Sequence, residues 1–348
     1  MLTSLEDLMS GYRNSPKIKT RAIIPCVKQA SILSHVSIII LLKGVVSELE
    51  QKTREGMALY IQPIGNAGAE ILGVDLSKQI SADDLIRIKD AFAEYGVIFF
   101  RDQSLSEAEH IKFAKNFGPI NINRFFARHT DFPEIAMVTK EPDQTSNIGG
   151  GWHTDHSYDQ EPAMGSILMA RNLPPEGGDT WFLNMYKAYE SLPHELKSRI
   201  AELSAIHSAK HIFGSKDQLE MLKQTRGRIG NSKAADALTD VTHPVVISHP
   251  ESNKPALYVN PGFTIRIKDV SSDESTKLLQ ELYLHAIKDE NMTKFKWRLG
   301  SIAFWDNRAS WHFAQNDYHG HRRVMHRITI EGCALQSALQ QANLTRLS

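Results

Sequence analysis

Two short segments far apart in the sequence constrain the fold most strongly. The first is Trp152-His153-Thr154-Asp155, and the second extends from Trp305 to Ile330 and contains His312. If the first segment is an extended strand, side chains two residues apart point to the same face. His153 and Asp155 would then direct an imidazole and a carboxylate toward one point. The fold has to bring His312 to that point if the three side chains act together.

Two histidine nitrogens and one carboxylate oxygen, with coordination positions left open, are the ligand set of non-haem Fe(II) oxygenases. We therefore expect His153, Asp155 and His312 to be metal ligands and catalytic residues. A zinc hydrolase could use the same three ligands, but no general base is evident beside them. A jelly-roll protein that binds a metal without catalysis is a further alternative.

The tripeptide His-Thr-Asp occurs twice in this chain. His129-Thr130-Asp131 is followed by Phe132-Pro133 in a polar stretch, and we interpret it as an exposed loop. The copy at 153–155 follows an aromatic residue and leads into a predicted strand, so we assign the ligands to it.

Other histidines compete with His312 as the third ligand. Those at 319 and 321 lie in a predicted turn, and those at 243 and 249 each precede a proline and are interpreted as loop residues. His326 has the opposite strand parity to Arg323 and Arg327, so it should point away from a cavity that contains both arginines. His312 is preferred because it precedes the arginine-bearing strand by one predicted hairpin.

The composition excludes several kinds of partner and site. Lys+Arg 40 against Asp+Glu 40 gives no net charge, which argues against nucleic-acid binding. Two cysteines cannot form a disulfide framework or a cysteine-rich metal site. The apolar run from Ser37 to Val46 is too short to span a membrane. We expect a cytoplasmic protein that acts on a small molecule, and both a monomer and a homo-oligomer remain open.

Residues 1–56 differ from the rest of the chain. From Leu8 to Ser47 there is no acidic residue but there are several basic ones. This stretch is predicted to be a disordered extension, an upstream translation start or an organelle-targeting segment. Residues 57–348 are predicted to form a single domain.

Within that domain the pattern indicates an α+β fold. Ser81 and Ser106 are expected to cap two helices, the first of which ends at Gly96, and Val97–Phe100 between them is a predicted buried strand. Further predicted strands follow at 166–170, 180–183, 244–247, 256–259, 301–305 and 323–331. Helices are predicted at 186–206 and 273–288, a polar loop at 121–151 and a surface excursion at 212–240.

Arg323 and Arg327 are four residues apart on one predicted strand and therefore share a face. They could be ordinary surface arginines that pair with acidic residues. If they point into the fold, however, burial of two guanidinium groups is costly unless anions meet them. The inward orientation would therefore imply anionic ligands, and 2-oxoglutarate would supply one.

Several spaced motifs in order resemble the TauD/TfdA family of Fe(II)- and 2-oxoglutarate-dependent dioxygenases. The resemblance covers about Tyr60 to Gly332 and is carried by the segments Trp152–Asp155, Gly177–Thr180, Trp305–Arg308, His312, Asp317-Tyr318 and Arg322–Arg327. The resemblance implies a double-stranded β-helix, or jelly roll, flanked by helices. It also implies Fe(II), 2-oxoglutarate and O2 as cofactor and cosubstrates.

Position by position, the resemblance implies that Thr180 and Arg323 bind the distal carboxylate of 2-oxoglutarate and that Arg327 faces the substrate anion. Where taurine-cleaving members carry a His and a Tyr, this chain offers Asn123 and Phe126, and Gly149 replaces an Asn. We therefore expect hydroxylation of an anion other than taurine, with an apolar or aromatic body. A sulfonate, an alkyl sulfate or an aryloxyalkanoate would fit.

Overall fold

The structure, a computed structural model, describes residues 58–213 and 239–341. By its internal contacts the chain divides into Met1–Met57 and Ala58–Ser348. The extension predicted at 1–56 and most of the excursion predicted at 212–240 lie outside the described residues. No helix in the described ranges is both long enough and apolar enough to cross a membrane.

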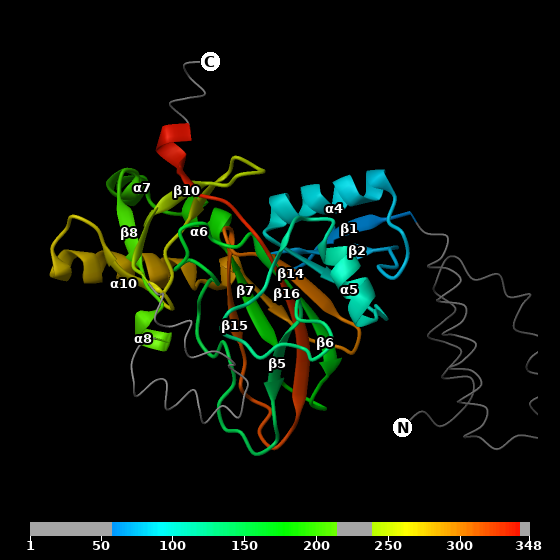
Figure 1. Cartoon of the computed structure of the whole chain (residues 1–348). Coiled ribbons are helices and arrows are strands. Elements are labelled where there is room, and N and C mark those ends of the chain that lie inside the picture. Colours follow the sequence, from blue (N-terminus) through cyan, green and yellow to red (C-terminus); the bar gives the residue numbers. More distant parts are fainter. Residues whose placement is uncertain (1–57, 214–238, 342–348) are drawn as a thin grey trace, which may run out of the picture. The chain divides into compact units, whose positions relative to one another are not determined.

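A large sheet forms one wall of the fold (Figure 1). Its strands, in spatial order, are β1 (Tyr60–Pro63), β2 (Ala69–Leu72), β3 (Val97–Phe100), β14 (Ile302–Asp306), β6 (Gly165–Asn172), β16 (Arg323–Ile330) and β4 (Ile120–Asn121), and β5 (Ala136–Lys140) also pairs with β16. All pairs are antiparallel except β2 with β3. The interval 121–151, predicted as a loop, therefore contains the strand β5.

Three smaller sheets complete the strand content of the described residues. The sheet that faces the large one contains β13 (Met292–Phe295), β7 (Thr180–Asn184) and β15 (Ser310–Ala314). The other two contain β12 (Thr264–Ile267), β8 (Ser204–His207) and β9 (Val241–Pro244), and β11 (Pro255–Leu257), β10 (Val246–Ser248) and β17 (Gln336–Ser337).

Successive side chains along a strand point to opposite faces of the large sheet, so a separate hydrophobic core lies on each face. On β3, Val97 and Phe99 point toward the facing sheet, whereas Ile98 and Phe100 point to the outer face. The inner core lies between the two sheets and comprises Val97, Phe99, Leu168, Ala170, Phe182, Phe295, Trp297, Ala303, Trp305 and Met325. Two facing sheets around one core confirm the predicted α+β class and jelly roll.

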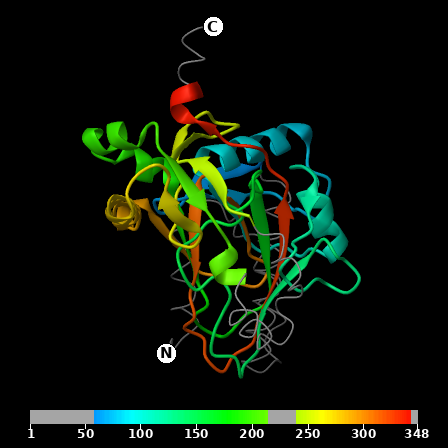
Figure 2. The same ribbon diagram turned by 60° about the vertical axis from the view of Figure 1, so that its left-hand side comes forward.

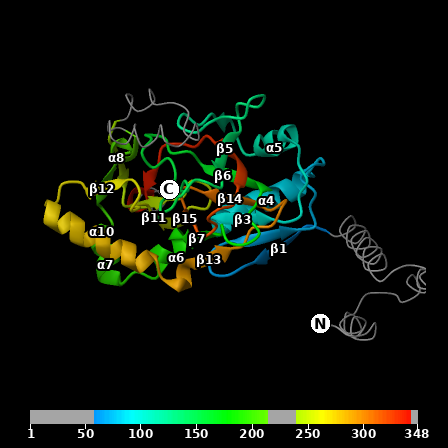
Figure 3. The same cartoon turned by 90° about the horizontal axis from the view of Figure 1, so that it is seen from below.

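Helices cover both outer faces, as Figures 1 and 3 show. On the large sheet lie α4 (Ala82–Tyr95) and α5 (Glu107–Ala114), and Phe92 of α4 stacks on Phe304 of β14 at a centroid distance of 4.0 Å. Across the molecule lie α6 (Met185–Glu190), α7 (His194–Ile200), α8 (Lys210–Phe213), α10 (Ser272–Ala286) and the short η4 (Asp289–Asn291). Figure 2 looks almost along α10.

The predicted helix ends are confirmed where local chemistry determines them. Ser81 accepts a hydrogen bond from the backbone N–H of Asp84, Gly96 ends α4 with a left-handed φ of 70°, and Ser106 forms a capping box with Glu109. The predicted helix at 186–206 is wrong as a single element. It is split before Pro193, since proline cannot donate the hydrogen bond that a helix interior requires, and residues 204–207 form β8.

A cluster of titratable groups lies under α5 on the outer face of the large sheet. His110 is fully buried, and neither of its ring nitrogens has a hydrogen-bond partner among the described residues. Burial and the nearby Arg171 and His326 lower the pKa of His110 to about 3. Burial, Arg171 and His129 lower the pKa of His326 to about 4, against the opposing effect of Glu107.

These histidines predict a loss of stability in acid. Below pH 6.5, roughly the pKa of an unfolded histidine, the unfolded chain takes up protons that the folded chain excludes. Stability should therefore fall as the pH falls from 6.5 toward 4, by up to about 1.4 kcal/mol per pH unit for each group. The melting temperature of a His110→Met variant should depend less on pH between 7 and 5 than that of the wild type. His194→Met, at an exposed position of α7, is the control and should follow the wild type.

Candidate active site

The segment that contains His153 is hydrogen-bonded alongside β15, the strand of His312. The His312 backbone N–H donates to the His153 carbonyl at 2.8 Å, the His153 N–H donates to the His312 carbonyl at 3.2 Å, and Ala314 donates to Gly149 at 3.0 Å. His153 forms only an isolated bridge with His312, and a turn begins at Asp155, so the predicted strand at this motif is wrong. The two imidazoles face each other because their backbones are direct neighbours.

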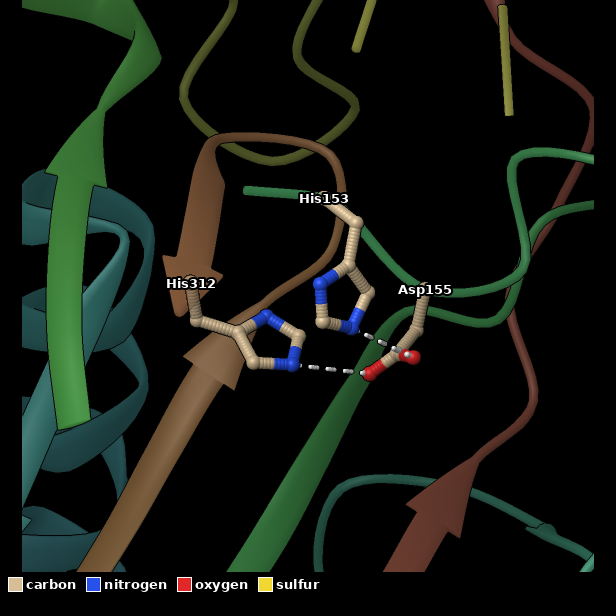
Figure 4. Close-up of side chains that lie close together, drawn as sticks. All are labelled: His153, Asp155 and His312. Atoms are coloured by element: carbon tan, nitrogen blue, oxygen red, sulfur yellow. Dashed lines mark ion pairs between the residues drawn. The ribbon is translucent and has the colours of Figure 1, made fainter. Parts of the chain in front are cut away.

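The three predicted ligands converge on one point (Figure 4). Nε2 of His153 lies 3.7 Å from Oδ1 of Asp155, and Nε2 of His312 lies 3.5 Å from Oδ2. Asp155 and His312 are buried, and the ligand atoms of all three residues lie within 4.8 Å of one another. The structure thus brings together His153, Asp155 and His312 from segments far apart in the sequence.

The protonation states of this group suit a divalent metal. Nδ1 of His153 lies 2.8 Å from the Gly151 carbonyl, which can only accept, so Nδ1 carries the proton and the Nε2 lone pair points inward. Burial, His153 and Arg327 hold the pKa of His312 well below its usual range, which keeps this ring neutral. Burial opposes ionisation of Asp155, but Arg327 and the two histidines outweigh it and lower the pKa of this carboxyl. Two imidazoles and a carboxylate are the donors of a facial triad that leaves positions open.

His312 reaches this point by a different route from the predicted one. Its strand, β15, belongs to the small sheet, whereas β16 belongs to the large sheet, so the chain crosses between sheets and forms no hairpin. His326 points to the outer face, as its parity predicted, and there accepts a hydrogen bond from Arg171. His319 and His321 are exposed, as predicted.

Three further histidines differ from the sequence-based interpretation. His243 and His249 are not surface loop residues but are buried, and His243 belongs to β9. His129 is half-buried, and its ring packs against His326 at 5.6 Å on the outer face of the sheet. His129 and Asp131 are absent from the metal-ligand groups of the described residues.

A second group of possible metal ligands among the described residues is His249, Glu251 and Asp306. Arg308 fills this group, because its Nη2 lies 2.7 Å from Oδ2 of Asp306 and 2.7 Å from Oε2 of Glu251. The guanidinium already neutralises both carboxylates, so the group is a buried ionic network rather than a cation site. It braces the turn whose Asn307 carbonyl accepts a hydrogen bond from the Thr154 hydroxyl.

Arg323 and Thr180 lie on opposite sheets at one end of the space between them. The hydroxyl of Thr180 accepts a hydrogen bond from Trp297 Nε1 at 3.0 Å, which leaves its own proton free to donate. Arg323 is buried, its Nη2 donates to the Gly178 carbonyl at 3.2 Å, and its Nε has no hydrogen-bond partner among the described residues. Its guanidinium carbon lies 5.7 Å from the ring of Trp297 and 5.9 Å from that of Tyr318. Such a cation with a free donor fits the carboxylate of an anionic ligand.

Arg327 lies next to Asp155 on the same inner face as Arg323. Its Nη2 is 2.8 Å from Oδ2 of Asp155, and its Nε and Nη2 both donate to the hydroxyl of Ser166, at 3.1 and 2.8 Å. The ring of Phe126 lies 5.6 Å from its guanidinium carbon, as does that of Trp305. The side-chain oxygen of Asn123 accepts hydrogen bonds from the N–H groups of residues 125 and 126, so Asn123 holds the turn that presents Phe126.

The sequence-based reasoning did not identify several residues that shape this site. Ser166 and Trp297 were not singled out, and no local pattern marks them, because each acts through a partner far away in the chain. The turn at Gly262 carries the detectable signal Asn-Pro-Gly. A Cβ at Gly262 would lie 2.6 Å from Cβ of His153, closer than packing permits.

This contact gives a testable consequence. Gly262→Ala should displace His153 and weaken the binding of Mn(II) or Co(II) by about tenfold or more, an effect of the size seen when supports of metal ligands are removed. The matched control is Gly151→Ala, since a Cβ at Gly151 would meet nothing within 4 Å. Metal titrations that give equal affinities for the two variants would refute the proposed contact.

Comparison with known proteins agrees with this geometry. The sequence profile described as "Taurine catabolism dioxygenase TauD, TfdA family" matches residues 60–329. An alkylsulfatase from Acinetobacter baylyi is 35% identical over 278 residues, which cover 77% of this chain and 83% of that protein. An alpha-ketoglutarate-dependent sulfate ester dioxygenase from Pseudomonas putida is 32% identical, with coverages of 79% and 90%.

Solved structures show the same relationship. The crystal structure of a taurine dioxygenase from Burkholderia xenovorans matches with a TM-score of 0.67 and 30% identity, and covers 81% of this chain and 93% of that one. A structure of AAD-2 in complex with Mn(II) and N-oxalylglycine matches with a TM-score of 0.64 and 26% identity, with coverages of 79% and 98%. The chain belongs to the TauD/TfdA family of 2-oxoglutarate-dependent dioxygenases.

Proposed function

We propose that this enzyme binds Fe(II) through His153, Asp155 and His312, and that it hydroxylates a small organic anion. The observation that supports this most strongly is the pair of buried arginines on the inner face of β16. One of them, Arg327, lies beside the proposed metal ligand Asp155, whereas Arg323 forms no ion pair with any described residue. Arg323 is therefore the buried cation that calls for an anionic ligand, which we propose is the 2-oxoglutarate cosubstrate. Arg327 already meets the Asp155 carboxylate, and we assign it to the substrate anion because it matches the substrate-facing arginine of the family.

Each side chain has a distinct task in this proposal. His153 and His312 present Nε2 lone pairs, and Asp155 presents a carboxylate, so these three side chains would hold the metal and leave positions open. Arg323 and the hydroxyl of Thr180 donate to the distal carboxylate of 2-oxoglutarate and so orient its other end toward the metal ligands. Iron(II) and 2-oxoglutarate together supply oxidation of a substrate C–H bond by O2, with release of succinate and CO2. Arg327 holds the substrate anion and thereby selects the carbon that faces the metal.

The surroundings of Arg327 favour a substrate with an apolar body. Phe126 and Trp305 contact the guanidinium of Arg327, and a cluster that contains Phe125, Tyr158 and Phe263 lies near His153. The ring of Phe263 is 6.2 Å from that of His153 and 4.7 Å from that of Tyr158. Apolar walls exclude water and suit an alkyl or aryl group. We therefore propose alkyl sulfates, larger sulfonates and aryloxyalkanoates ahead of taurine.

The experiment measures succinate formation from 2-oxoglutarate with Fe(II) in the presence of alkyl sulfates, larger sulfonates, aryloxyalkanoates and taurine, each tested separately. We expect succinate and a hydroxylated or cleaved product in equal amounts with at least one apolar anion, and slow turnover with taurine. A neutral analogue of the best substrate should lose most of its specificity constant. If no anion raises succinate formation above the substrate-free rate, the substrate assignment fails. If metal and 2-oxoglutarate do not bind, the whole proposal fails.

A further inference from the structure

A turn of two glycines packs directly against Arg323. Gly177 and Gly178 both have left-handed backbone conformations, with φ of 76° and 71°. Nη2 of Arg323 donates to the Gly178 carbonyl at 3.2 Å, and a Cβ at Gly178 would lie 3.3 Å from both Cδ and Nε of Arg323. A shift of this turn would therefore move the guanidinium group that we assign to 2-oxoglutarate.

Asp317 holds the glycine turn from its other side. Oδ1 of Asp317 accepts a hydrogen bond from the backbone N–H of Gly178 at 2.7 Å. A Cβ at Gly177 would lie only 2.6 Å from the same oxygen, so the carboxylate and the turn are in close contact. The backbone N–H of Gln315 donates to the Asp179 carbonyl at 2.9 Å. The segment that follows β15 thus fixes the turn at two points.

The turn needs this support because glycine is conformationally permissive. Two successive glycines leave the position of the Gly178 carbonyl poorly determined by the backbone alone. Thr180, beyond the turn, is held by strand pairing, since it lies opposite Ala314 on one side and Phe295 on the other. The hydroxyl of Thr180 is thus fixed by the sheet, whereas the guanidinium of Arg323, at the end of a long side chain, depends on the turn.

The charge of Asp317 does not favour the proposed ligand. A carboxylate near the site of an anion opposes the binding of that anion. This charge is felt across the turn, because burial and the charge of Asp317 together raise the pKa of Asp179. The hydrogen bond to Gly178 is therefore the favourable contribution of Asp317 to this end of the site. The two effects have opposite signs, so substitutions can separate them.

We propose that Asp317 is a positioning residue that orients Arg323, through Gly178, for the distal carboxylate of 2-oxoglutarate. The inference rests on the proposed function, which places that carboxylate at Arg323 and Thr180. Asp317 accepts from the N–H of Gly178, and the carbonyl of the same glycine accepts from Nη2 of Arg323. Nε of Arg323, which has no hydrogen-bond partner among the described residues, is then kept in place for the ligand.

Binding without turnover tests this role. The wild type, Asp317→Ala and Asp317→Asn are loaded with Mn(II) in the absence of O2. Each is titrated with 2-oxoglutarate and with 2-oxopentanoate, in which a methyl group replaces the distal carboxylate. Both variants lack the charge, but only asparagine keeps an oxygen acceptor. Asp317→Ala should therefore bind 2-oxoglutarate about fivefold more weakly than Asp317→Asn, the scale of one hydrogen bond. Asp317→Asn should bind it at least as tightly as the wild type, and 2-oxopentanoate should bind equally to all three.

A double-mutant cycle shows whether Asp317 acts through Arg323. In an Arg323→Met background, the alanine and asparagine variants of Asp317 should bind 2-oxoglutarate equally. Asp75→Ala is the matched control, because Asp75 and Asp317 are both exposed and Oδ1 of Asp75 also accepts a backbone N–H, that of Ser77, at 3.0 Å. This control should bind both ligands as the wild type does.

The contrary results are distinct from one another. Equal 2-oxoglutarate affinities of the alanine and asparagine variants would refute the positioning role, and so would a difference that persists in the Arg323→Met background. Equal losses for both ligands would show that Asp317 only supports the fold. Asp317→Leu replaces the alanine variant if that does not fold. If Arg323→Met weakens 2-oxoglutarate no more than 2-oxopentanoate, the cosubstrate assignment of the proposed function is itself wrong.

Discussion

Replacement of His312 with alanine should abolish 2-oxoglutarate turnover while leaving the fold intact. His312 provides one of the two imidazoles of the proposed metal site, and its loss would remove one of the three protein ligands of the triad. Its Nδ1 has no hydrogen-bond partner among the described residues, so little structural bonding is lost. The melting temperature of the metal-free protein should change by only a few degrees. Metal titration and succinate assays on the same preparation measure both effects.

The other His-Thr-Asp copy supplies the control. His129→Ala should keep metal binding and turnover, because His129 packs on the outer face of the large sheet against His326 and Phe132. His153→Ala should behave like His312→Ala. Loss of metal binding in the His129 variant together with its retention in the His153 variant would overturn the ligand assignment.

Replacement of Arg323 and replacement of Arg327, both on β16, should impair different properties of the enzyme. Arg323→Ala removes charge-assisted hydrogen bonds to the distal carboxylate, worth about 1.5–3 kcal/mol. The Michaelis constant for 2-oxoglutarate should therefore rise by roughly one to two decades. Arg327→Ala should leave that constant nearly unchanged and uncouple the reaction, so that cosubstrate is consumed with little product. Parallel assays of succinate and of product measure the coupling ratio.

The contact between Arg327 and Asp155 calls for one further control. Because Arg327 also lies 2.8 Å from a proposed metal ligand, its removal could change metal affinity as well as substrate binding. Assays at saturating Fe(II) remove this ambiguity. If Arg327→Ala raises the constant for 2-oxoglutarate and spares coupling, the two roles are reversed. If neither variant changes either quantity, the inference of an anionic substrate falls.

Features with a local cause could be predicted from the sequence. The caps at Ser81 and Ser106 and the stop at Gly96 depend on residues within one turn of the helix end. The parity of β16 was also predictable, since alternation along a strand is a property of the backbone. It placed His326 outside and both arginines inside, and the structure has all three buried on the expected faces.

Features with a non-local cause could not be predicted. The segment of β5 lies between Pro133 and Pro142, and its extended conformation comes from pairing with β16 nearly two hundred residues later. The sequence predicted that His153 and Asp155 converge, but for the wrong reason. Their segment is not a strand, because His153 forms only an isolated bridge and a turn begins at Asp155. Their meeting with His312 depends on backbone hydrogen bonds between distant segments.

The reciprocal hydrogen bonds between the backbones of His153 and His312 bear on how the protein would lose and regain a metal ion. The spacing of the two imidazoles is fixed by main-chain geometry, as in any pair of neighbouring strands, and so does not depend on the ion. If the site holds iron as proposed, loss of the ion by chelation would be a local event that leaves the two imidazoles in place. Reloading would then require no refolding, and the affinity for iron would contain little cost of ordering the chain.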